Sequence, residues 1–465
     1  MRNKLLNFGV NVGYPIIDFI VITAGILLSY KIYRILGIGQ NVYYQSSQLF
    51  PFSLMAAGIT IICMGGFGVY KKESSILNVE EIKNCIKGIT FSFFILSLIL
   101  VFGKINLSRY TLIFSFVLCV IATVAEKMIF YNILPSFAPL QGYHKRVLIY
   151  GAGELGKALF RSLANSPKMR IIPVGFIDDD PSKSDMVCYQ SGFNCKHCLR
   201  VIGTRADIQR LKEEYGINEI FIAISNIKDK HLRELLDYLK QQRIEASFVP
   251  NLHEAFLHKV TIKKIGDLPI VKEIDFYHRP LYIVVKRYMD FILAAFLLTL
   301  LWPLFAVIAV AIKLDSKGSV IFKQTRVGKE GKIFQIYKFR SMFAETDAHA
   351  INPVDFKDPR ITRVGRFLRK TSLDELPQII NVLKGEMSFV GPRPEMPFIA
   401  EKYDGIQKER LTVLPGITGL WQLSGDRSKA IHENMDYDLY YIRNVSFFLD
   451  VAILIQTTFF AFKGI

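Results

Sequence analysis

The 465-residue chain is long enough to form several domains. Its mean hydropathy of +0.27, with 51% hydrophobic and 13% aromatic residues, is too high for an average soluble enzyme and indicates an integral membrane protein. The formal net charge of +17 therefore suits an anionic membrane face and phosphorylated substrates. Nucleic acid is not expected as a partner, because the sequence contains no zinc-finger, basic-zipper or RNA-binding motif.

The first third of the chain contains four apolar segments, near residues 13–34, 51–70, 86–103 and 110–133. Each is long enough, or nearly so, to cross a hydrocarbon core of ~30 Å as a helix. If the segments alternate across the membrane, nine Lys or Arg residues flank them on one side and four on the other. This bias predicts a four-helix transmembrane bundle over residues 1–140 with both ends in the cytoplasm.

A Rossmann-like α/β module is predicted over residues 141–265, in the cytoplasm. Residues 145–157 have the pattern of a strand, a glycine turn and a helix, and residues 171–177 resemble a second strand that ends just before an aspartate. That spacing is typical of the acid that binds a ribose in dinucleotide-binding folds. The candidate nucleotide-binding residues are Gly151, Gly153, Gly156 and Asp178. A module of the same fold that binds no nucleotide is the alternative.

Within this module, Cys188, Cys195, His197 and Cys198 lie close together in the sequence. Their spacing allows a small zinc site, but only one C-x-x-C pair is present. We therefore favour a loop that carries free thiols, with the zinc site as the alternative.

An uncharged run over residues 291–312 is long enough to span a membrane. Pro303 lies in its middle and has no N–H to donate, which predicts a kink or a break in the helix. Basic residues flank both ends of the run. A re-entrant helical hairpin over about residues 286–313, returning to the cytoplasmic face, fits this pattern better than a fifth spanning helix.

The segment that follows this run is strongly basic. Between Lys313 and Lys370, fourteen Lys or Arg residues stand against six acidic residues. Such a surface binds anionic lipid headgroups, but arginine on a restricted backbone also suits bidentate contacts to phosphate. The arginines in such contexts are Arg340, Arg369 and Arg393, the last one between two prolines. We expect these three side chains to bind phosphate.

Two adjacent carboxylates, Asp374 and Glu375, lie just ahead of Pro377. A helix that starts at Asp374 would put Pro377 in its first turn, where a missing N–H is tolerated. The positive end of the helix dipole would then keep both carboxylates ionised and attract a phosphate or its metal ion. An ordinary acidic helix start is the alternative.

The last part of the chain contains a series of motifs in a fixed order. They are Lys286-Arg287 through Asp290 and residues 322–328, 338–342, 368–378, 381–385, 390–395, 415–422 and 438–441. With these motifs, residues 281–465 closely resemble the bacterial sugar transferase family, the polyprenyl-phosphate hexose-1-phosphate transferases. The helices and the α/β module before them resemble the long-form members of that family.

The resemblance implies a membrane protein of α plus α/β class, in which the bundle and the Rossmann-like module precede a mainly helical catalytic domain over residues 281–465. It implies transfer of hexose-1-phosphate from a UDP-sugar to undecaprenyl phosphate, with release of UMP, as the first membrane step of exopolysaccharide, capsule or O-antigen synthesis. The expected location is the bacterial inner membrane, with the catalytic domain on the cytoplasmic face. The expected partners are the UDP-sugar, undecaprenyl phosphate and the lipid bilayer, and a homodimer is left open.

The same resemblance implies a role for each site residue. Asp374 is the expected nucleophile, which forms a covalent phosphosugar intermediate, and Asp374 and Glu375 are expected to hold Mg²⁺ across the diphosphate. The expected phosphate-binding residues are Lys338, Arg340, Arg369, Gln378 and Arg393.

Two other functions remain open from the sequence. Some membrane-bound nucleotide-sugar dehydratases and epimerases carry a similar bundle and module, but they need a further dinucleotide fold with a Tyr-x-x-x-Lys base. The match to that motif after residue 260 is Tyr282 with Lys286, directly before the expected re-entrant helix. The second alternative is a non-catalytic scaffold of a polysaccharide export complex, whose basic face only binds lipid.

Overall fold

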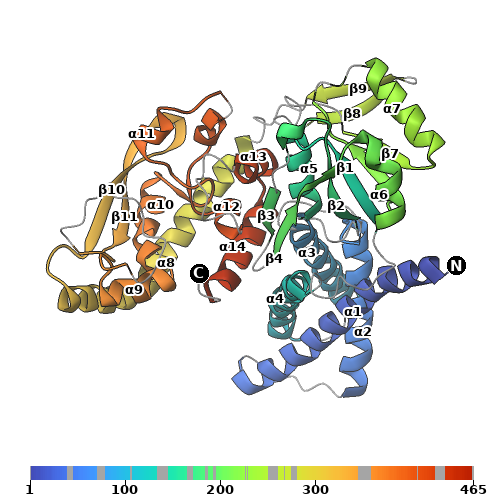
Figure 1. Cartoon of the computed structure of the whole chain (residues 1–465). Helices are drawn as coiled ribbons and strands as arrows, with labels where there is room; N and C mark the ends of the chain where they lie inside the picture. The colour runs from blue at the N-terminus through green and yellow to red at the C-terminus, as the bar shows by residue number, and fades with distance from the viewer. Residues whose placement is uncertain are drawn as a thin grey trace. The chain divides into compact units, whose positions relative to one another are not determined.

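The chain folds into two compact units, Met1–Leu252 and His253–Ile465, which Figure 1 draws from blue to green and from yellow to red. The computed structural model describes residues 2–38, 46–70, 79–104, 107–133, 145–164, 171–183, 187–191, 195–225, 227, 229–249, 260–265, 268–273, 280–343, 358–405, 407–424 and 435–462.

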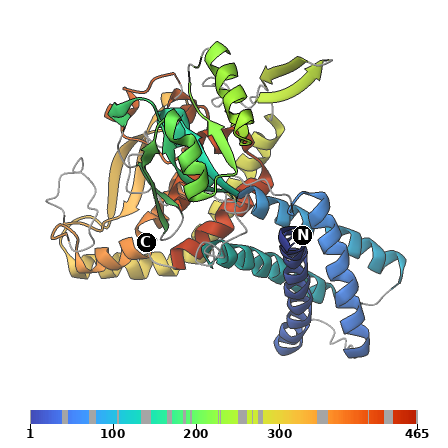
Figure 2. The same cartoon turned by 45° about the vertical axis from the view of Figure 1, so that its right-hand side comes forward.

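The first unit begins with long apolar helices. They are α1 (Arg2–Leu36), α2 (Ser46–Gly66), α3 (Val79–Phe102) and α4 (Arg109–Ile133). Each contains a stretch long and apolar enough to cross a membrane. Helices α1 and α3 each pack against both α2 and α4 (Figure 2). Ile22 and Ile26 are buried among the helices, whereas Ile20, Ile62 and Val101 are exposed, as lipid-facing side chains would be.

An α/β module follows these helices. Its strands are β1 (Lys145–Tyr150), β2 (Ile171–Ile177), β5 (Val201–Gly203), β6 (Glu219–Ile222) and β7 (Glu245–Phe248). They form one parallel sheet in the order β5-β2-β1-β6-β7, which is the strand order of a Rossmann-type sheet. The helices of the module are α5 (Glu154–Ala164), α6 (Ile208–Tyr215) and α7 (Asp229–Gln241), with the 3-10 helices η4 (Pro181–Lys183) and η5 (Arg205–Asp207).

Alternate side chains of β1 enter two separate hydrophobic cores, one on each face of the sheet. Val147 and Ile149 pack with α5, where Phe160 is buried. Leu148 and Tyr150 pack on the opposite face with α6 and α7. This alternation is expected of a strand that is buried on both faces, because successive side chains point to opposite sides.

Two glycines make the tight turn between β1 and α5 possible. Gly151 has a φ of +113°, and a Cβ added there would lie 2.4 Å from the carbonyl oxygen of Ala223. A Cβ added to Gly156 would lie 1.8 Å from the carbonyl oxygen of Gly151. A Cβ on Gly153 would meet nothing within 4 Å, so the turn is open to solvent at that position.

The cysteine-rich segment forms a hairpin and not a loop. Strand β3 (Val187–Ser191) pairs antiparallel with β4 (Cys195–Leu199), and the register sets Cys188 opposite Cys198. Cys198 takes part in a disulfide bond, so the expectation of free thiols is wrong for this residue. A disulfide sulfur is not a thiolate ligand, so Cys198 does not serve in the alternative zinc site. The side chains of Cys188, Cys195 and His197 lie outside the described residues.

The second unit starts with the hairpin of β8 (Val260–Ile265) and β9 (Leu268–Glu273), followed by the long helix α8 (Pro280–Asp315). Strand β10 (Ile321–Val327) pairs antiparallel with β11 (Ile333–Phe339), and β12 (Ser388–Val390) pairs parallel with β13 (Gly416–Thr418). The other helices are α9 (Arg363–Lys370), α10 (Ile379–Lys384), α11 (Pro397–Ala400), α12 (Leu420–Leu423), α13 (Met435–Asn444) and α14 (Phe447–Phe462). The 3-10 helices are η6 (Lys329–Gly331), η7 (Leu373–Gln378) and η8 (Gln407–Thr412).

Helix α8 has 36 residues and continues through Pro303. Pro303 therefore does not interrupt the helix, because one missing N–H removes a single hydrogen bond from a long ladder. The re-entrant path through a kink at Pro303 stays a prediction. Its last turns pack Ile308 and Ile312 against β11 and α9. Its middle is exposed, with Leu300 and Trp302 59% and 66% accessible, so this helix presents a large apolar surface.

The segment that carries Asp374 and Glu375 is the 3-10 helix η7, and the α-helix α10 starts only at Ile379. The sequence predicted an α-helix from Asp374. Pro377 lies inside η7, and the α-helical hydrogen bonds begin only after it, with α10. Ser372, directly before η7, has a φ of +56°, a left-handed conformation that is uncommon for a residue with a side chain.

Candidate active site

Asp374 and Glu375 lie on η7, which packs against strand β11. Lys338 belongs to β11, and its Nζ donates a hydrogen bond to Glu375 Oε1 at 2.7 Å. Arg393 comes from the loop after β12, and its Nη2 donates to the same oxygen at 3.0 Å. Side chains that are 37 and 18 residues away from Glu375 in the sequence therefore meet at one carboxylate.

The two carboxyl groups ionise differently. Burial raises the pKa of Asp374 to about 6 against the opposing charge of Lys338, and the charge of Glu375 adds to the rise. Burial also acts to raise the pKa of Glu375, but Lys338 and Arg393 outweigh it and hold that pKa well below its usual range. Asp374 thus stays ionised only above a pH of about 6, because burial outweighs the nearby cations, whereas Glu375 is ionised well below that pH.

Two more arginines act on this pair through their charge. Arg369, in the last turn of α9, favours the ionised form of Asp374. Arg326, on β10, is largely buried; burial lowers its pKa to about 10, and the nearby charge of Arg393 adds to this effect. Together with Lys338 and Arg393, four cations thus act around Asp374, Glu375 and the nearby Glu395, which lies 3.9 Å from Arg326. The net positive charge suits an anionic substrate.

The loop that carries Arg393 is fixed by a buried ion pair. Arg410, on η8, donates through Nη2 to the carbonyl oxygen of Arg393 at 2.9 Å and through Nε to Asp438 Oδ2 of α13 at 2.8 Å. Arg410 and Asp438 are 4% and 1% exposed, so each needs the other as its partner. Gly391 precedes the loop, and a Cβ there would lie 2.4 Å from the carbonyl oxygen of Leu414, so only glycine allows this close approach.

Arg340 and Gln378 do not join the cluster. Arg340 is 7% exposed, and its Nη2 donates to the carbonyl oxygen and Oγ of Ser316 at 2.7 and 2.9 Å, just past the end of α8. A cation at this point complements the negative end of the helix dipole. Gln378 is buried at the end of η7, and among the described residues its side chain makes no hydrogen bond to either carboxylate.

Sequence reasoning missed Arg326, Arg410 and Asp438 as parts of the site. Arg326 and Asp438 lie inside the family motifs, which was the available signal, whereas Arg410 lies outside them. What the sequence did not reveal is the partner of each buried charge, because Arg410 and Asp438 are 28 residues apart.

The candidate nucleotide-binding residues lie in the first unit, where Asp178 contacts the glycine turn. Its Oδ2 accepts a hydrogen bond from Ala152 N at 2.8 Å, and its Oδ1 accepts one from Asp180 N at 3.0 Å. Lys183 Nζ lies 3.3 Å from Oδ2. The carboxylate of Asp178 therefore supports the turn, whereas a ribose-binding acid would need its oxygens free for the ligand.

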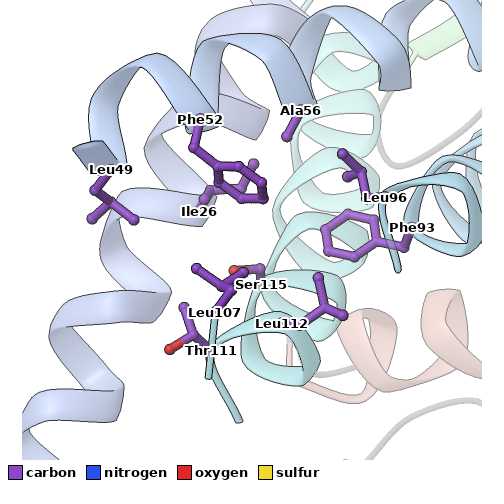
Figure 3. Close-up of a pocket in the computed structure, with 10 residues that line it drawn as sticks. All are labelled: Ile26, Leu49, Phe52, Ala56, Phe93, Leu96, Leu107, Thr111, Leu112 and Ser115. Atoms are coloured by element: carbon purple, nitrogen blue, oxygen red, sulfur yellow. The ribbon is translucent and has the colours of Figure 1, made fainter. Parts of the chain in front are cut away.

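A pocket lies among the apolar helices of the first unit (Figure 3). Figure 3 labels the residues that line it, of which only Thr111 and Ser115 carry a polar group. Because no charged side chain lines this pocket, it is not a site for a phosphate.

A metal ion would find its best ligands at Asp374 and Glu375. Glu375 Oε1 is held by two cations, but no hydrogen bond or ion pair to the Asp374 carboxylate occurs within the described part of the chain. Mg²⁺ usually takes one or two carboxylates together with substrate phosphates, and not a full cage of protein ligands. This pair therefore fits Mg²⁺ when a phosphorylated substrate completes the site.

Two sequence-family models match the chain. The model described as bacterial sugar transferase matches residues 281–464, and the model described as CoA-binding domain matches residues 66–250.

The chain is also similar to curated bacterial proteins over most of its length. It is 30% identical to the UDP-glucose:undecaprenyl-phosphate glucose-1-phosphate transferase of Klebsiella pneumoniae, across 96% of this chain and 94% of that protein. It is 33% identical to the protein of the same name from Escherichia coli strain K12, across 69% of this chain and 68% of that protein. It is 30% identical to the undecaprenyl-phosphate galactose phosphotransferase of Salmonella typhimurium, across 86% of this chain and 85% of that protein. From these matches and the motifs around Asp374, the chain belongs to the bacterial sugar transferase family.

Proposed function

We propose that the chain transfers a hexose-1-phosphate from a UDP-sugar to undecaprenyl phosphate and releases UMP. The observation that carries the proposal is the Glu375 carboxylate held by Lys338 and Arg393 beside Asp374, in a chain related over 96% of its length to a glucose-1-phosphate transferase. The cations offset the charge of a diphosphate, and the adjacent carboxylate can then approach phosphorus. The lipid-linked product would start exopolysaccharide, capsule or O-antigen synthesis.

The reaction proceeds through a covalent intermediate on Asp374. A carboxylate oxygen of Asp374 attacks the sugar-linked phosphorus, the bond from that phosphorus to the bridging oxygen breaks, and UMP leaves with the electron pair. A phosphate oxygen of undecaprenyl phosphate then attacks the same phosphorus, and the Asp374 carboxylate is released. No proton has to be taken from the nucleophile, since Asp374 is ionised above a pH of about 6.

The neighbouring residues bind and orient the phosphates. Lys338, Arg393 and Arg369 contact the phosphate oxygens, and Glu375 keeps the first two in place. Mg²⁺, held by Asp374 and Glu375, would offset further charge on the diphosphate when bound. Arg340 is less well placed for this role, because it binds the end of α8.

The long helix α8 kinks at Pro303, enters the membrane and returns to the same side. Arg287, in its N-terminal half, donates to the carbonyl oxygen of Val382 at 2.7 Å, and Asp315, at its end, accepts from Val364 N at 2.9 Å. A straight helix of 36 residues is about 54 Å long, which exceeds a hydrocarbon core of ~30 Å. The ends of a spanning helix would lie on opposite sides, so contacts from both ends to one compact unit support re-entry.

The apolar helices α1 to α4 form a four-helix bundle in the bacterial inner membrane. The excess of Lys and Arg on one side of these helices supports a cytoplasmic position for the α/β module and the catalytic residues, where nucleotide sugars are available. A homodimer stays a prediction.

The alternative functions are less well supported. Tyr282 and Lys286, which match the motif of dehydratases and epimerases, both donate to Asp450 Oδ2 at 2.6 Å, so neither is free to act as a base. A scaffold that only binds lipid would need no cluster of cations around two carboxylates.

An assay of UMP release tests the reaction class and the donor together. Purified full-length chain is incubated with undecaprenyl phosphate, Mg²⁺ and each of a panel of UDP-sugars. We expect release of UMP from one or a few donors, and loss of both release and covalent phosphosugar adduct in Asp374→Asn. Lys332→Met, a change at an exposed lysine of β10–β11, is the control and should keep full activity. A fully active Asp374→Asn variant would exclude the nucleophile assignment.

A further inference from the structure

The first turns of α8 carry polar side chains that the transfer reaction does not use. Tyr282, Lys286 and Asp290 recur at every fourth residue and so lie on one face of the helix, with Arg287 beside them. Asp290 is 6% exposed, whereas Tyr288, which points away from this face, is 66% exposed. Buried polar groups on an apolar helix are costly unless each has a fixed partner.

Lys286 and Tyr282 bind one carboxylate of the C-terminal helix α14. The Nζ of Lys286 and the hydroxyl of Tyr282 each donate to Asp450 Oδ2 at 2.6 Å. The hydroxyl of Tyr441, on α13, lies 2.8 Å from Asp450 Oδ1. Asp450 is 7% exposed. A single buried carboxylate therefore joins α8 to α13 and α14.

Arg287 binds the far end of the helical segment that carries the reactive carboxylates. Its Nη1 and Nη2 donate to the carbonyl oxygens of Val382 and Leu383 at 2.7 and 3.1 Å. These carbonyls lie in the last turn of α10, where the helical hydrogen-bond ladder ends and where a cation complements the helix dipole. Because α10 continues directly from η7, Arg287 links α8 to the segment that bears Asp374.

Asp290 completes the link at the Arg393 loop. Its Oδ1 lies 3.4 Å from the N–H of Phe389, which donates from β12. The loop with Arg393 follows β12 directly. The polar face of α8 is thus connected separately to α14, to α10 and to β12.

We infer that Tyr282, Lys286, Arg287 and Asp290 are positioning residues that align the membrane-borne acceptor with the reactive carboxylates. The inference rests on the proposed transfer reaction. It adds that these residues of α8 determine how well the lipid acceptor binds. The lipid acceptor reaches the site along the membrane helix, whereas the UDP-sugar arrives from water. Loosening α8 from Asp450 therefore disturbs acceptor binding and leaves donor binding in place.

The test is a comparison of the two KM values in the full-length chain in detergent micelles. Initial rates of UMP release are measured with undecaprenyl phosphate varied and then with the UDP-sugar varied. In Asp450→Asn we expect the KM for undecaprenyl phosphate to rise about tenfold and the KM for the UDP-sugar to change less than about twofold. Tyr282→Phe, which removes one hydroxyl, should show the same selectivity with a smaller rise.

Arg287→Lys gives a second, different expectation. Lysine keeps the charge but cannot donate the bidentate pair of hydrogen bonds, so α10 and η7 should shift. We therefore expect kcat, measured with both substrates saturating, to fall. Asp436→Asn on α13 and Tyr288→Phe on α8 are matched controls at exposed positions and should leave both KM values unchanged.

Equal rises in both KM values, or no change in either, would overturn the inference, because a general loss of stability cannot select one substrate. If Asp450→Asn fails to fold, the ratio of the two KM values in Tyr282→Phe decides. A wild-type chain that releases no UMP with any donor would contradict the proposed function itself. The variants test only the inference about α8, so the two failures are distinguishable.

Discussion

Asp374 and Glu375 are neighbours in the sequence, yet their side chains have different partners. Both cations that reach the pair by hydrogen bond, Lys338 and Arg393, bind the same oxygen of Glu375. Lys338 and Arg393 act on Asp374 through their charge and not through a hydrogen bond, and burial raises the pKa of Asp374. The arrangement suits the two roles proposed for the pair, because Glu375 stays an anion that holds the cations, whereas the Asp374 oxygens would be available for phosphorus.

The raised pKa of Asp374 predicts the pH dependence of the reaction. A group with a pKa of about 6 is protonated below that pH, and a protonated carboxyl cannot attack phosphorus. We expect kcat/KM for the UDP-sugar to fall about tenfold for each pH unit below pH 6 and to level off above it. A profile that stays flat down to about pH 5, in protein shown to be folded there, would contradict this expectation.

A variant at Lys338 tests the cause of that pH dependence. The charge of Lys338 lowers the pKa of Asp374, so its removal in Lys338→Met should move the falling limb to higher pH, whatever the loss in absolute rate. An unchanged limb would mean that a group other than Asp374 is titrating.

At the site, residue types revealed the groups that bear charge but not their pairing. The adjacent carboxylates and Arg393 between its prolines could be recognised from sequence, and they do meet at Glu375. Arg340 was chosen by the same reasoning, but its guanidinium turns to the carbonyl of Ser316. Which acceptor an arginine reaches depends on how distant segments pack together. That packing cannot be read from a single sequence.

Among the elements, the helices of the first unit are joined by a buried ion pair. Lys127 of α4 and Asp18 of α1 are 2% and 0% exposed, and Nζ lies 2.8 Å from Oδ1. Tyr70, just after α2, donates to Asp18 Oδ2 at 3.0 Å, and Glu126 lies 3.1 Å from Lys127. Charges inside apolar helices persist only when they are paired, so this cluster ties three segments together.

Removal of Lys127 should destabilise the bundle. In Lys127→Met the carboxylate of Asp18 stays buried without its cation, at a cost of about 3–5 kcal/mol. We expect a clear fall in the thermal unfolding midpoint in micelles, and recovery of most of it in the double variant Asp18→Asn, Lys127→Met. Lys31→Met, at an exposed position of α1, is the control. An unchanged midpoint in Lys127→Met would show that the pair contributes nothing.

The elements themselves were predictable to the extent that periodicity and hydropathy determine them. The long apolar helices and the strand, turn and helix around Gly151 lie close to their expected positions. The proline arguments were less accurate about where helices start and end: α8 continues through Pro303, and Pro377 lies inside a 3-10 helix and not in the first turn of an α-helix. Proline removes one N–H, but the neighbouring contacts decide whether the helix ends, tightens or continues.

At the scale of the whole molecule, the chain combines a unit with a glycine turn and a unit with the reactive carboxylates. The glycine turn has the form used to bind nucleotides, but Asp178 already binds Ala152 and Asp180 of its own loop. This internal bonding favours a module that takes no direct part in phosphate transfer, and substitution of the turn can separate the two possibilities.

Gly153 is the position for this substitution. A Cβ there meets nothing within 4 Å, so Gly153→Leu should fold normally and place a bulky side chain where a ligand would approach the turn. We expect UMP release with unchanged kcat and KM. Gly156→Ala is the contrasting variant: its Cβ would lie 1.8 Å from the carbonyl oxygen of Gly151, so the module itself should be destabilised. Complete loss of UMP release in a folded Gly153→Leu chain would instead make the glycine turn part of the substrate site, because nothing else in the variant changes.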